Sequence, residues 1–229
     1  IIITHAHWDH VGGISVFREP KTKLITSAQF AQELQVINGA PLPFTYVFGR
    51  DLKKQIYTLT PDHLVQRTEE LVIGDLRLKL IPASGGETPD ALIIHDVKNR
   101  IAVVGDVLMP YFGAPWAAEG SPENLLHTIR TLRTLNAKSL IHGHDPLTRY
   151  FNTGALAGLE KAVAETITHT KQMTSAGRTA TEILRELKLP AVLKTEPHAV
   201  LAFLVMREGL IQRVARDRVG YWSADGEGI

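Results

Sequence analysis

Three histidines and an aspartate stand within six residues near the start of this chain, directly after the short β-branched run Ile1–Ile3. They are His5, His7, Asp9 and His10. In an extended segment, residues two apart project to the same side, so His5 and His7 can bind one metal ion through their imidazole nitrogens. Asp9 and His10 are adjacent and face differently, so they can bind a second cation close to the first. The spacing therefore predicts a two-metal site on a loop that follows a buried strand.

The amino-acid composition limits both the residue types that can bind metal and the classes of partner that the chain is expected to bind. The 229 residues include no cysteine, so histidine and carboxylates are the only strong metal ligands that the chain offers. Basic and acidic residues number 25 and 24 without long runs, a balance that lacks the electrostatic footprint of nucleic-acid binding. No apolar run reaches the roughly 18 residues that cross a bilayer. We therefore expect a small-molecule substrate and neither nucleic acid nor membrane as a partner, while the compartment stays open.

Strand and helix patterns alternate through residues 1–153, which predicts an α/β domain. Short apolar runs bounded by turn residues indicate strands over 1–3, 23–27, 71–73, 76–81, 91–94, 101–104 and 139–141. Helical patterns cover residues 14–18 and 28–36. A further helix is expected to run from Pro122 to Leu135, because Ser121 can cap its first turn and proline favours the first helical position.

Residues 154–229 change character and predict a small helical domain. Apolar residues from Leu156 recur at helical spacing over about 20 residues. Thr179 and Glu182 have the spacing of a capping box at the start of the next helix. Two later stretches, Leu201 to Val205 and Leu210 to Tyr221, also indicate helix. An all-helical tail of this kind is a natural interaction element.

The ligand cluster, written His5-Ala-His7-Trp-Asp9-His10, resembles the H-x-H-x-D-H pattern of the metallo-β-lactamase superfamily. The resemblance implies an αββα sandwich in which further metal ligands come from later loops at strand ends. This chain offers Glu87, Asp106 and His144 in that order, each after an expected strand. Because strands normally precede the ligand loop in this fold, a chain that starts at Ile1 is expected to form an N-terminally truncated sandwich.

Glu87 points to one branch of the superfamily. The commonest members carry histidine in a G-H-T-P-G stretch, whereas Gly85-Gly-Glu87-Thr-Pro-Asp-Ala-Leu92 is similar to the alkylsulfatase-type branch. The aromatic segment Phe44 to Gly49 resembles the same branch. Two parts of the tail, Gly177 to Leu189 and Ile211 to Asp225, resemble its helical dimerisation domain. The resemblance therefore implies a homodimer formed through residues 154–229.

Carried over residue by residue, the resemblance implies two metal ions in each chain. His5, His7 and Glu87 would hold the first, and Asp9, His10 and His144 the second, with Asp106 bridging both. Zinc suits this mixture of imidazole and carboxylate best, and iron or manganese are alternatives. Asp9 is also expected to act in catalysis, by orienting the attacking water or receiving its proton.

The implied activity is that of a binuclear hydrolase, which cleaves an ester with a hydroxide held between the metals. An alkyl sulfate is the most concrete substrate, and a carboxylic ester, thioester or lactone is the alternative. The segment after Asp106, from Val107 to Trp116, is apolar, whereas the alkylsulfatase pattern continues with polar residues and an arginine that help to hold sulfate. Glu87 argues against a true class B β-lactamase. The hypothesis from a different functional class is a metal-binding dimer module that has no catalytic activity.

Two other histidines need an explanation. His142 stands two residues before His144, either as a partner that orients a metal ligand or as a capped residue at a strand end. His95 could in principle replace the missing family histidine, but it stands eight residues after Glu87 at the other end of a strand. We therefore favour Glu87 as the ligand.

Overall fold

The computed structural model describes residues 1–39, 56–84, 87–108, 121–145 and 147–216, without the side chains of Leu147 and Arg216. Four sequence predictions fall wholly or partly outside these ranges. They concern the aromatic segment 44–49, the start of the stretch 85–92, the apolar segment 109–116 and the tail residues 217–225. None of the described helices is long and apolar enough to cross a membrane.

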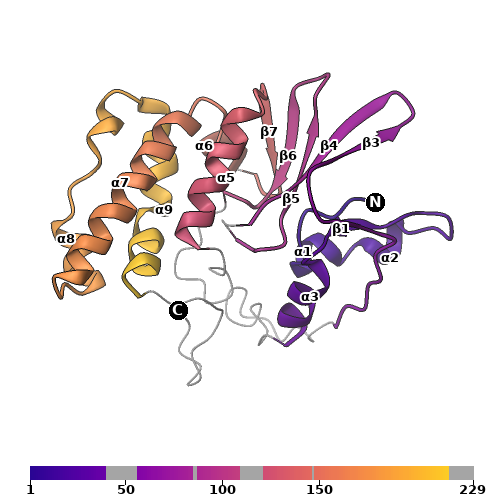
Figure 1. Ribbon diagram of the computed structural model, residues 1–229, viewed down its shortest axis with the longest axis horizontal. Coiled ribbons are helices and arrows are strands. Elements are labelled where there is room, and N and C mark those ends of the chain that lie inside the picture. The colour runs from indigo at the N-terminus through magenta and orange to yellow at the C-terminus, as the bar shows by residue number, and fades with distance from the viewer. Residues whose placement is uncertain (40–55, 85–86, 109–120, 146, 217–229) are drawn as a thin grey trace.

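A five-stranded sheet forms the centre of the molecule (Figure 1). Its strands lie in the order β3-β4-β5-β6-β7, antiparallel except for the parallel pair β6 and β7. They span Glu69–Ile73, Leu76–Pro82, Leu92–Asp96, Ile101–Gly105 and Ser139–His142. All five strands expected in this region are confirmed, with ends that differ by no more than two residues.

A second, parallel sheet consists of β1 (Ile25–Ser27) and β2 (His63–Val65). The first residues of the chain extend it, because Ile2 forms a bridge with Ile25 and the Ile3 amide donates to the Ile25 carbonyl at 3.0 Å. The predicted strand at residues 1–3 is therefore a single bridge. Strand β2 was not predicted, since its three residues carry too short a pattern.

Successive side chains of β4 and β5 point to opposite faces of the large sheet and contact different layers of the fold. Ile81 and Ile93 join a core that includes Ile129 of α5 (Pro122–Thr134), so this helix covers one face of the large sheet. Leu80 and Leu92 point to the other face and join the core shared with β1 and β2. Outside the small sheet lie α1 (Trp8–Val11), α2 (Ile14–Phe17) and α3 (Phe30–Gly39). The layer order is α-β-β-α, as the family resemblance implied.

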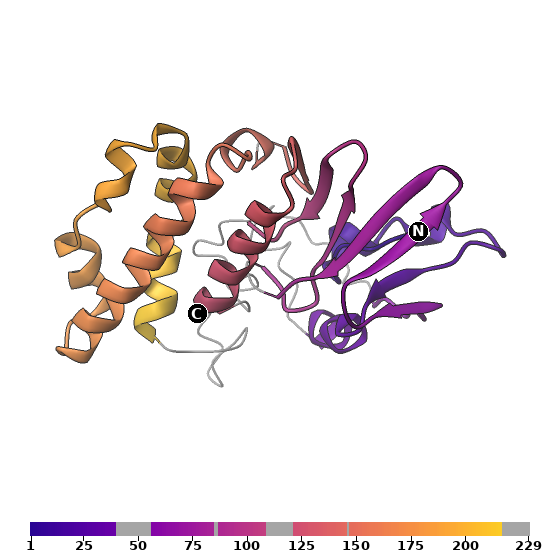
Figure 2. The ribbon, with the colours of Figure 1, turned by 45° about the horizontal axis from the view of Figure 1, so that its top comes forward.

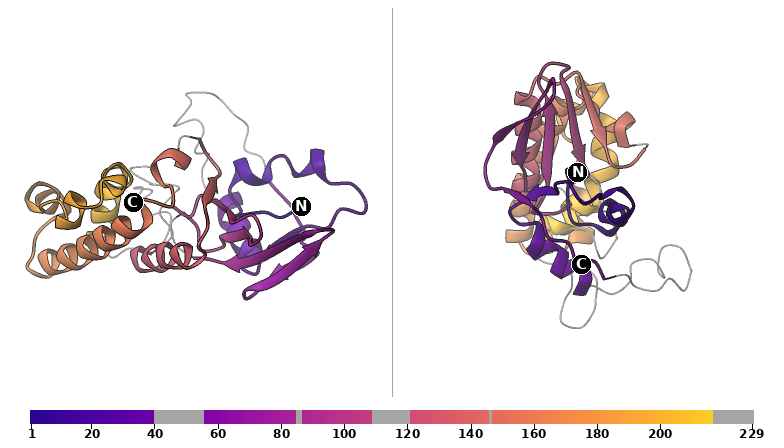
Figure 3. Two further views of the ribbon diagram at one scale, coloured as in Figure 1. Left: turned by 90° about the horizontal axis from the view of Figure 1, so that it is seen from above. Right: turned by 90° about the vertical axis from the view of Figure 1, so that its right-hand side faces the viewer.

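The C-terminal region is helical (Figures 2 and 3). It contains α6 (Leu147–Tyr150), α7 (Leu156–Ser175), α8 (Ala180–Glu186), a 3-10 turn (Ala191–Lys194) and α9 (Pro197–Arg216). The predicted caps are confirmed: Ser121 accepts from the Asn124 amide, and Thr179 with Glu182 forms a capping box. As far as Arg216, where the described residues end, the two helical stretches expected after residue 200 form one continuous helix, α9.

The helical region shares its core with the sheet. Leu159 and Val163 of α7 and Phe203 of α9 are fully buried in the same cluster as Leu140 of β7. Glu160 of α7 also pairs with Arg130 and Arg133 of α5. These contacts tie α7 to the helix that covers the sheet, on the side away from α1 to α3 in Figure 3.

Candidate metal centre

Strand directions bring the expected ligand loops to one edge of the large sheet. Strands β4 and β6 both run antiparallel to β5, and β7 runs parallel to β6, so β4, β6 and β7 end at the same edge. Glu87, Asp106 and His144 each follow one of these strand ends. The N-terminal ligand loop joins them there, because the Leu92 amide donates to the Thr4 carbonyl at 2.7 Å. Four loops far apart in sequence therefore converge.

Two glycines allow these loops to approach closely. Gly105 has a positive φ of 53°, and a Cβ atom there would lie 2.8 Å from the Thr4 side chain. At Gly143 a Cβ atom would lie 2.4 Å from Asp106 Oδ1 and 2.5 Å from His10 Cε1. Any side chain at Gly143 would therefore displace the side chain of Asp106 or that of His10.

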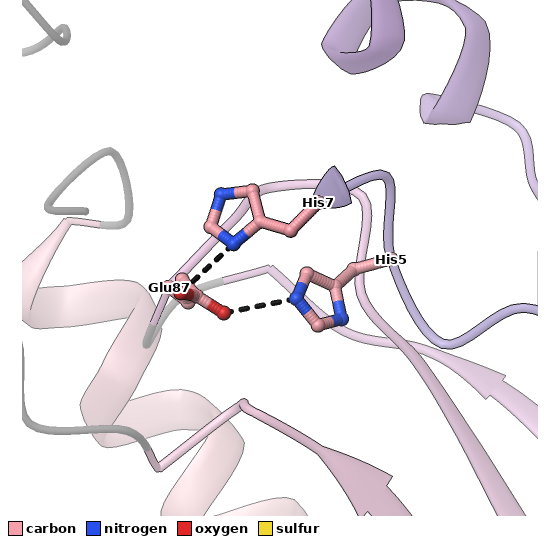
Figure 4. Close-up of side chains that lie close together, drawn as sticks. All are labelled: His5, His7 and Glu87. Carbon is pink, nitrogen blue, oxygen red and sulfur yellow. Dashed lines mark ion pairs between the residues drawn. The ribbon is translucent and has the colours of Figure 1, made fainter. Parts of the chain in front are cut away.

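The inner triad consists of His5, His7 and Glu87, and all three side chains are buried (Figure 4). His5 Nε2 lies 2.9 Å from Glu87 Oε2, and His7 Nδ1 lies 2.8 Å from Glu87 Oε1. The two rings thus present different nitrogens to one carboxylate. The other nitrogen of His5, Nδ1, lies 3.1 Å from the Thr4 hydroxyl oxygen, which helps to fix that ring.

The outer triad consists of Asp9, His10 and His144, which are closer to the surface. His144 Nε2 lies 3.1 Å from Asp9 Oδ2, and His10 Nε2 lies 3.4 Å from the same oxygen. The His144 side chain is 40% exposed, whereas that of His5 is 2% exposed. A ligand arriving from solvent would therefore meet the outer triad first.

Asp106 lies between the two triads. Its Oδ2 atom is 3.2 Å from His10 Nε2 and 3.1 Å from His144 Nε2, both in the outer triad. The same oxygen is 3.9 Å from His5 Nε2 in the inner triad. The structure thus brings together all seven residues that the sequence singled out, with Asp106 between the two triads.

The charges of these groups hold the cluster together. Burial opposes ionisation of Glu87, but the adjacent His7 and His5 rings bring the pKa of its carboxyl far below the ordinary value. Burial also works against a charged His10, yet hydrogen bonds to Asp106 and Asp9 raise its pKa to about 10. Burial lowers the pKa of His5. In the protein alone, protons on histidine balance the buried carboxylates, and a cation can take over that role.

The donor set fits divalent metal ions. His5 Nε2 and Glu87 Oε2 are buried and face each other, yet neither forms a well-aligned hydrogen bond with any described residue. In each triad one ligand atom per residue falls within 4.8 Å of the others. Imidazole nitrogens mixed with carboxylate oxygens suit zinc, and the oxygen-rich share also suits iron or manganese. The inner and outer triads can therefore each hold one ion.

The two remaining histidines lie differently from the cluster. His142 is buried, and its Nε2 donates to the Phe151 carbonyl at 3.0 Å, which supports the prediction of a capped residue at a strand end. His95 lies within β5, opposite Lys79 and Ala102, and belongs to neither triad. Glu87 occupies the place where a ligand was expected.

Two buried acids outside the triads were not singled out from the sequence. Asp90 is 2% exposed and Glu33 is 6% exposed. Burial, and secondarily the charge of Glu33, raises the pKa of Asp90 to about 7. A signal was available for Asp90 alone, because it stands where the family stretch G-H-T-P-G ends in glycine.

A family model of the metallo-beta-lactamase superfamily matches residues 1–144. The chain belongs to this superfamily. The match ends at His144, so it spans all seven residues of the two triads and Asp106. Members of the superfamily are typically metal-dependent hydrolases. Among curated protein sequences, none matches the chain.

Solved structures extend the likeness beyond the superfamily domain. The sec-alkylsulfatase Pisa1 from Pseudomonas sp. is similar over 98% of this chain and 42% of its own, with 17% identity and a TM-score of 0.70. A metallo-beta-lactamase family protein from Thermus thermophilus is similar over 92% of this chain and 73% of its own, with 16% identity and a TM-score of 0.55. At these identities the likeness shows the fold alone.

The chain is shorter than several of the structures that it resembles. It spans 60% of the metallo-beta-lactamase from Pontibacter korlensis, which is similar over 63% of this chain with 19% identity and a TM-score of 0.44. It spans less than half of the Pseudomonas alkylsulfatase. Substrate and assembly are therefore matters for proposal.

Proposed function

We propose that this superfamily member is a binuclear metal-dependent hydrolase that cleaves an ester. The observation that carries the proposal is the position of Asp106 Oδ2, within 3.2 Å of His10 and His144 and 3.9 Å from His5. One carboxylate at the junction of two triads is the arrangement that two neighbouring cations require. When bound, such metals activate water at neutral pH and polarise the bond to be cleaved.

The two triads differ in burial and therefore in the roles that we assign to them. The buried inner triad provides a rigid position, since Glu87 is held between two rings. The outer triad faces solvent and can receive the substrate. Burial raises the pKa of the Asp9 carboxyl. The hydrogen bond with His10 and the charge of His10 together lower this pKa by more than burial raises it, so Asp9 remains a carboxylate. Its side chain is 22% exposed, which leaves it able to orient a water molecule or accept a proton.

The substrate that we test first is an alkyl sulfate ester. The fold likeness to the Pseudomonas sec-alkylsulfatase runs through the helical region, and Glu87 stands in a stretch similar to that branch. Carboxylic esters, thioesters and lactones form the comparison set, because the residues after Asp106 lack the polar groups expected for sulfate. Val107 and Leu108, which begin that segment, are both buried in the core.

The deciding experiment combines metal analysis with a substrate panel. Protein loaded with zinc, iron or manganese is analysed for metal content and then assayed against an alkyl sulfate, an aryl carboxylic ester, a thioester and a lactone. We expect two equivalents of metal in the wild type and about one in both Glu87→Ala and His144→Ala. The control is His127→Ala, an exposed residue of α5 outside both triads.

Each outcome separates the alternatives. Sulfate release that is lost in both triad variants supports the alkylsulfatase-like activity. Ester or lactone turnover alone keeps the metal centre and rejects the sulfatase. Two bound metals without turnover of any substrate favour a metal-binding dimer module, and a wild type that binds no metal rejects the proposed mechanism.

We further propose that the chain forms a homodimer through its helical region. Helix α9 carries three exposed apolar side chains on one face, because Leu204 and Val205 stand three and four residues after Leu201. An apolar stripe of this kind on an outer helix favours burial against another surface. Because the helical region resembles a dimerisation domain, we propose a second copy of the chain as the partner that covers this stripe.

A further inference from the structure

Thr4 joins the N-terminal ligand loop to two strands of the large sheet. It directly precedes His5 of the inner triad. Its carbonyl accepts the amide of Leu92, the first residue of β5, at 2.7 Å. Its side chain packs against Gly105 at the end of β6, because a Cβ atom at Gly105 would lie 2.8 Å from both Cβ and Oγ1 of Thr4. Contacts with both strands therefore hold Thr4 in place.

The Thr4 hydroxyl contacts the ring nitrogen of His5 that does not face Glu87. Thr4 Oγ1 lies 3.1 Å from His5 Nδ1, whereas His5 Nε2 lies 2.9 Å from Glu87 Oε2 (Figure 4). The His5 ring is only 2% exposed, so neither nitrogen can rely on solvent for a partner. Without the hydroxyl, a buried polar atom would lose its hydrogen bond, which is unfavourable.

A hydroxyl can serve either form of the neutral ring, because it both donates and accepts hydrogen bonds. When Nε2 carries the ring proton and faces Glu87, Nδ1 is an acceptor and the hydroxyl donates to it. When Nε2 binds a cation, the ring proton resides on Nδ1 and the hydroxyl accepts it. Metal-binding histidines almost always donate their second N–H to such a partner, which fixes the orientation and basicity of the ring. One hydroxyl can therefore hold the His5 ring in the same orientation with and without a metal.

We propose that Thr4 is a positioning residue of the inner triad. Its hydroxyl keeps Nε2 of His5 directed towards Glu87 and accepts the Nδ1–H hydrogen bond when a metal is bound. This role rests on the proposed metal centre and deepens it. Thr4 acts here only through the His5 ring, so its hydroxyl should matter for the inner position and not for the outer one.

The test separates the hydroxyl from the rest of the side chain. Thr4→Val replaces the hydroxyl by a methyl group of similar size, whereas Thr4→Ser keeps the hydroxyl and removes the methyl group. Metal-free protein is titrated with Zn²⁺ in competition with a chromophoric chelator, and with Co²⁺ to record the coordination spectrum of each position. Glu87→Ala and His144→Ala assign the two affinities to the inner and outer triads. We expect Thr4→Val to weaken the inner affinity by roughly 10- to 100-fold and to alter only the inner Co²⁺ spectrum, while Thr4→Ser restores both.

A matched control removes a hydroxyl elsewhere. Thr168 is an exposed residue of α7 whose hydroxyl donates to the Ala164 carbonyl at 2.9 Å, so Thr168→Val should change neither affinity. In a Glu87→Ala background the inner position is already lost, so adding Thr4→Val should change metal binding no further. Urea unfolding of the metal-free proteins measures any general loss of stability in parallel.

Three results overturn the inference while the metal centre stands. The first is an unchanged inner affinity and spectrum in Thr4→Val. The second is an equal loss in Thr4→Val and Thr4→Ser, which would assign the effect to packing against Gly105 and not to the hydroxyl. The third is an equal loss at both metal positions that follows a lower free energy of unfolding. A wild type that binds no metal overturns the proposed function and the inference with it.

Discussion

Asp106 Oδ2 lies 3.2 Å from His10 Nε2, although 96 residues separate them in the chain. The contact joins the N-terminal ligand loop to the end of β6, and the same oxygen also reaches His144 and His5. Removing this carboxylate should therefore affect both of the proposed metal positions, unlike the loss of any single member of a triad.

We accordingly predict that Asp106→Asn weakens both metal affinities by more than about tenfold, whereas Glu87→Gln weakens chiefly the inner one. The amide keeps the shape of the side chain but removes the negative charge that both positions share. Chelator competition on each variant provides the measurement, with Asp75→Asn as the control. Retention of one unaltered affinity in Asp106→Asn would show that Asp106 serves only one position.

Gly143 gives a steric test of the same contact. A Cβ atom at this position would lie 2.4 Å from Asp106 Oδ1, so Gly143→Ala must displace either the carboxylate or His10. We predict loss of the outer metal and of hydrolysis, with far-ultraviolet circular dichroism unchanged. Gly39→Ala is the matched control, because a Cβ atom there meets nothing within 4 Å. Normal metal content in Gly143→Ala would mean that the loops have more room than this geometry allows.

Much of the candidate centre could be predicted because four of its proposed ligands lie within six residues of one another. His5, His7, Asp9 and His10 need only one loop to bring them together, so their spacing alone indicates metal binding. Glu87, Asp106 and His144 are single residues at strand ends, and only the family pattern connected them to the cluster. Their meeting at one edge depends on strand directions that local sequence does not encode.

The parts that were missed depend on long-range packing. Asp90 lies on the β4–β5 loop and Glu33 on α3, so the effect of the Glu33 charge on Asp90 depends on the tertiary fold and not on local sequence. Helix α9 was expected as two pieces, Leu201 to Val205 and Leu210 to Tyr221. Gly209, a poor helix former, stands between them. Burial of Met206 and Leu210 on either side of Gly209 outweighs that preference and keeps the helix continuous.

The buried Asp90 also predicts a pH dependence of stability in the metal-free protein. Burial raises its pKa from the ordinary 3.8 to about 7, so between these values the folded protein holds a proton that the unfolded chain releases. Its contribution to the free energy of unfolding is complete below about pH 4. That contribution is lost as the pH rises towards 7.

Asp90→Asn removes this titration. Urea unfolding of both proteins with excess chelator, at intervals between pH 4 and 8, should show the stability of the wild type relative to the variant falling across that window. Each unit of the shift corresponds to about 1.4 kcal/mol, so a change of a few kcal/mol is expected. A constant difference between the two proteins would mean that Asp90 ionises normally in the folded state.

The last prediction concerns the exposed face of α9. Leu201 and Val205 are 56% and 40% exposed and stand four residues apart, so they project from the same side of the helix. If this face joins two copies, the double variant Leu201→Glu, Val205→Glu places like charges in an apolar interface and should halve the molar mass measured by light scattering after size exclusion. Metal binding should persist, because both residues lie outside the triads. Val72→Glu is the control, since Val72 is equally exposed at 56% but lies on β3. A wild type that is monomeric at micromolar concentration, or a double variant that stays dimeric, would show that this apolar face does not join two copies of the chain.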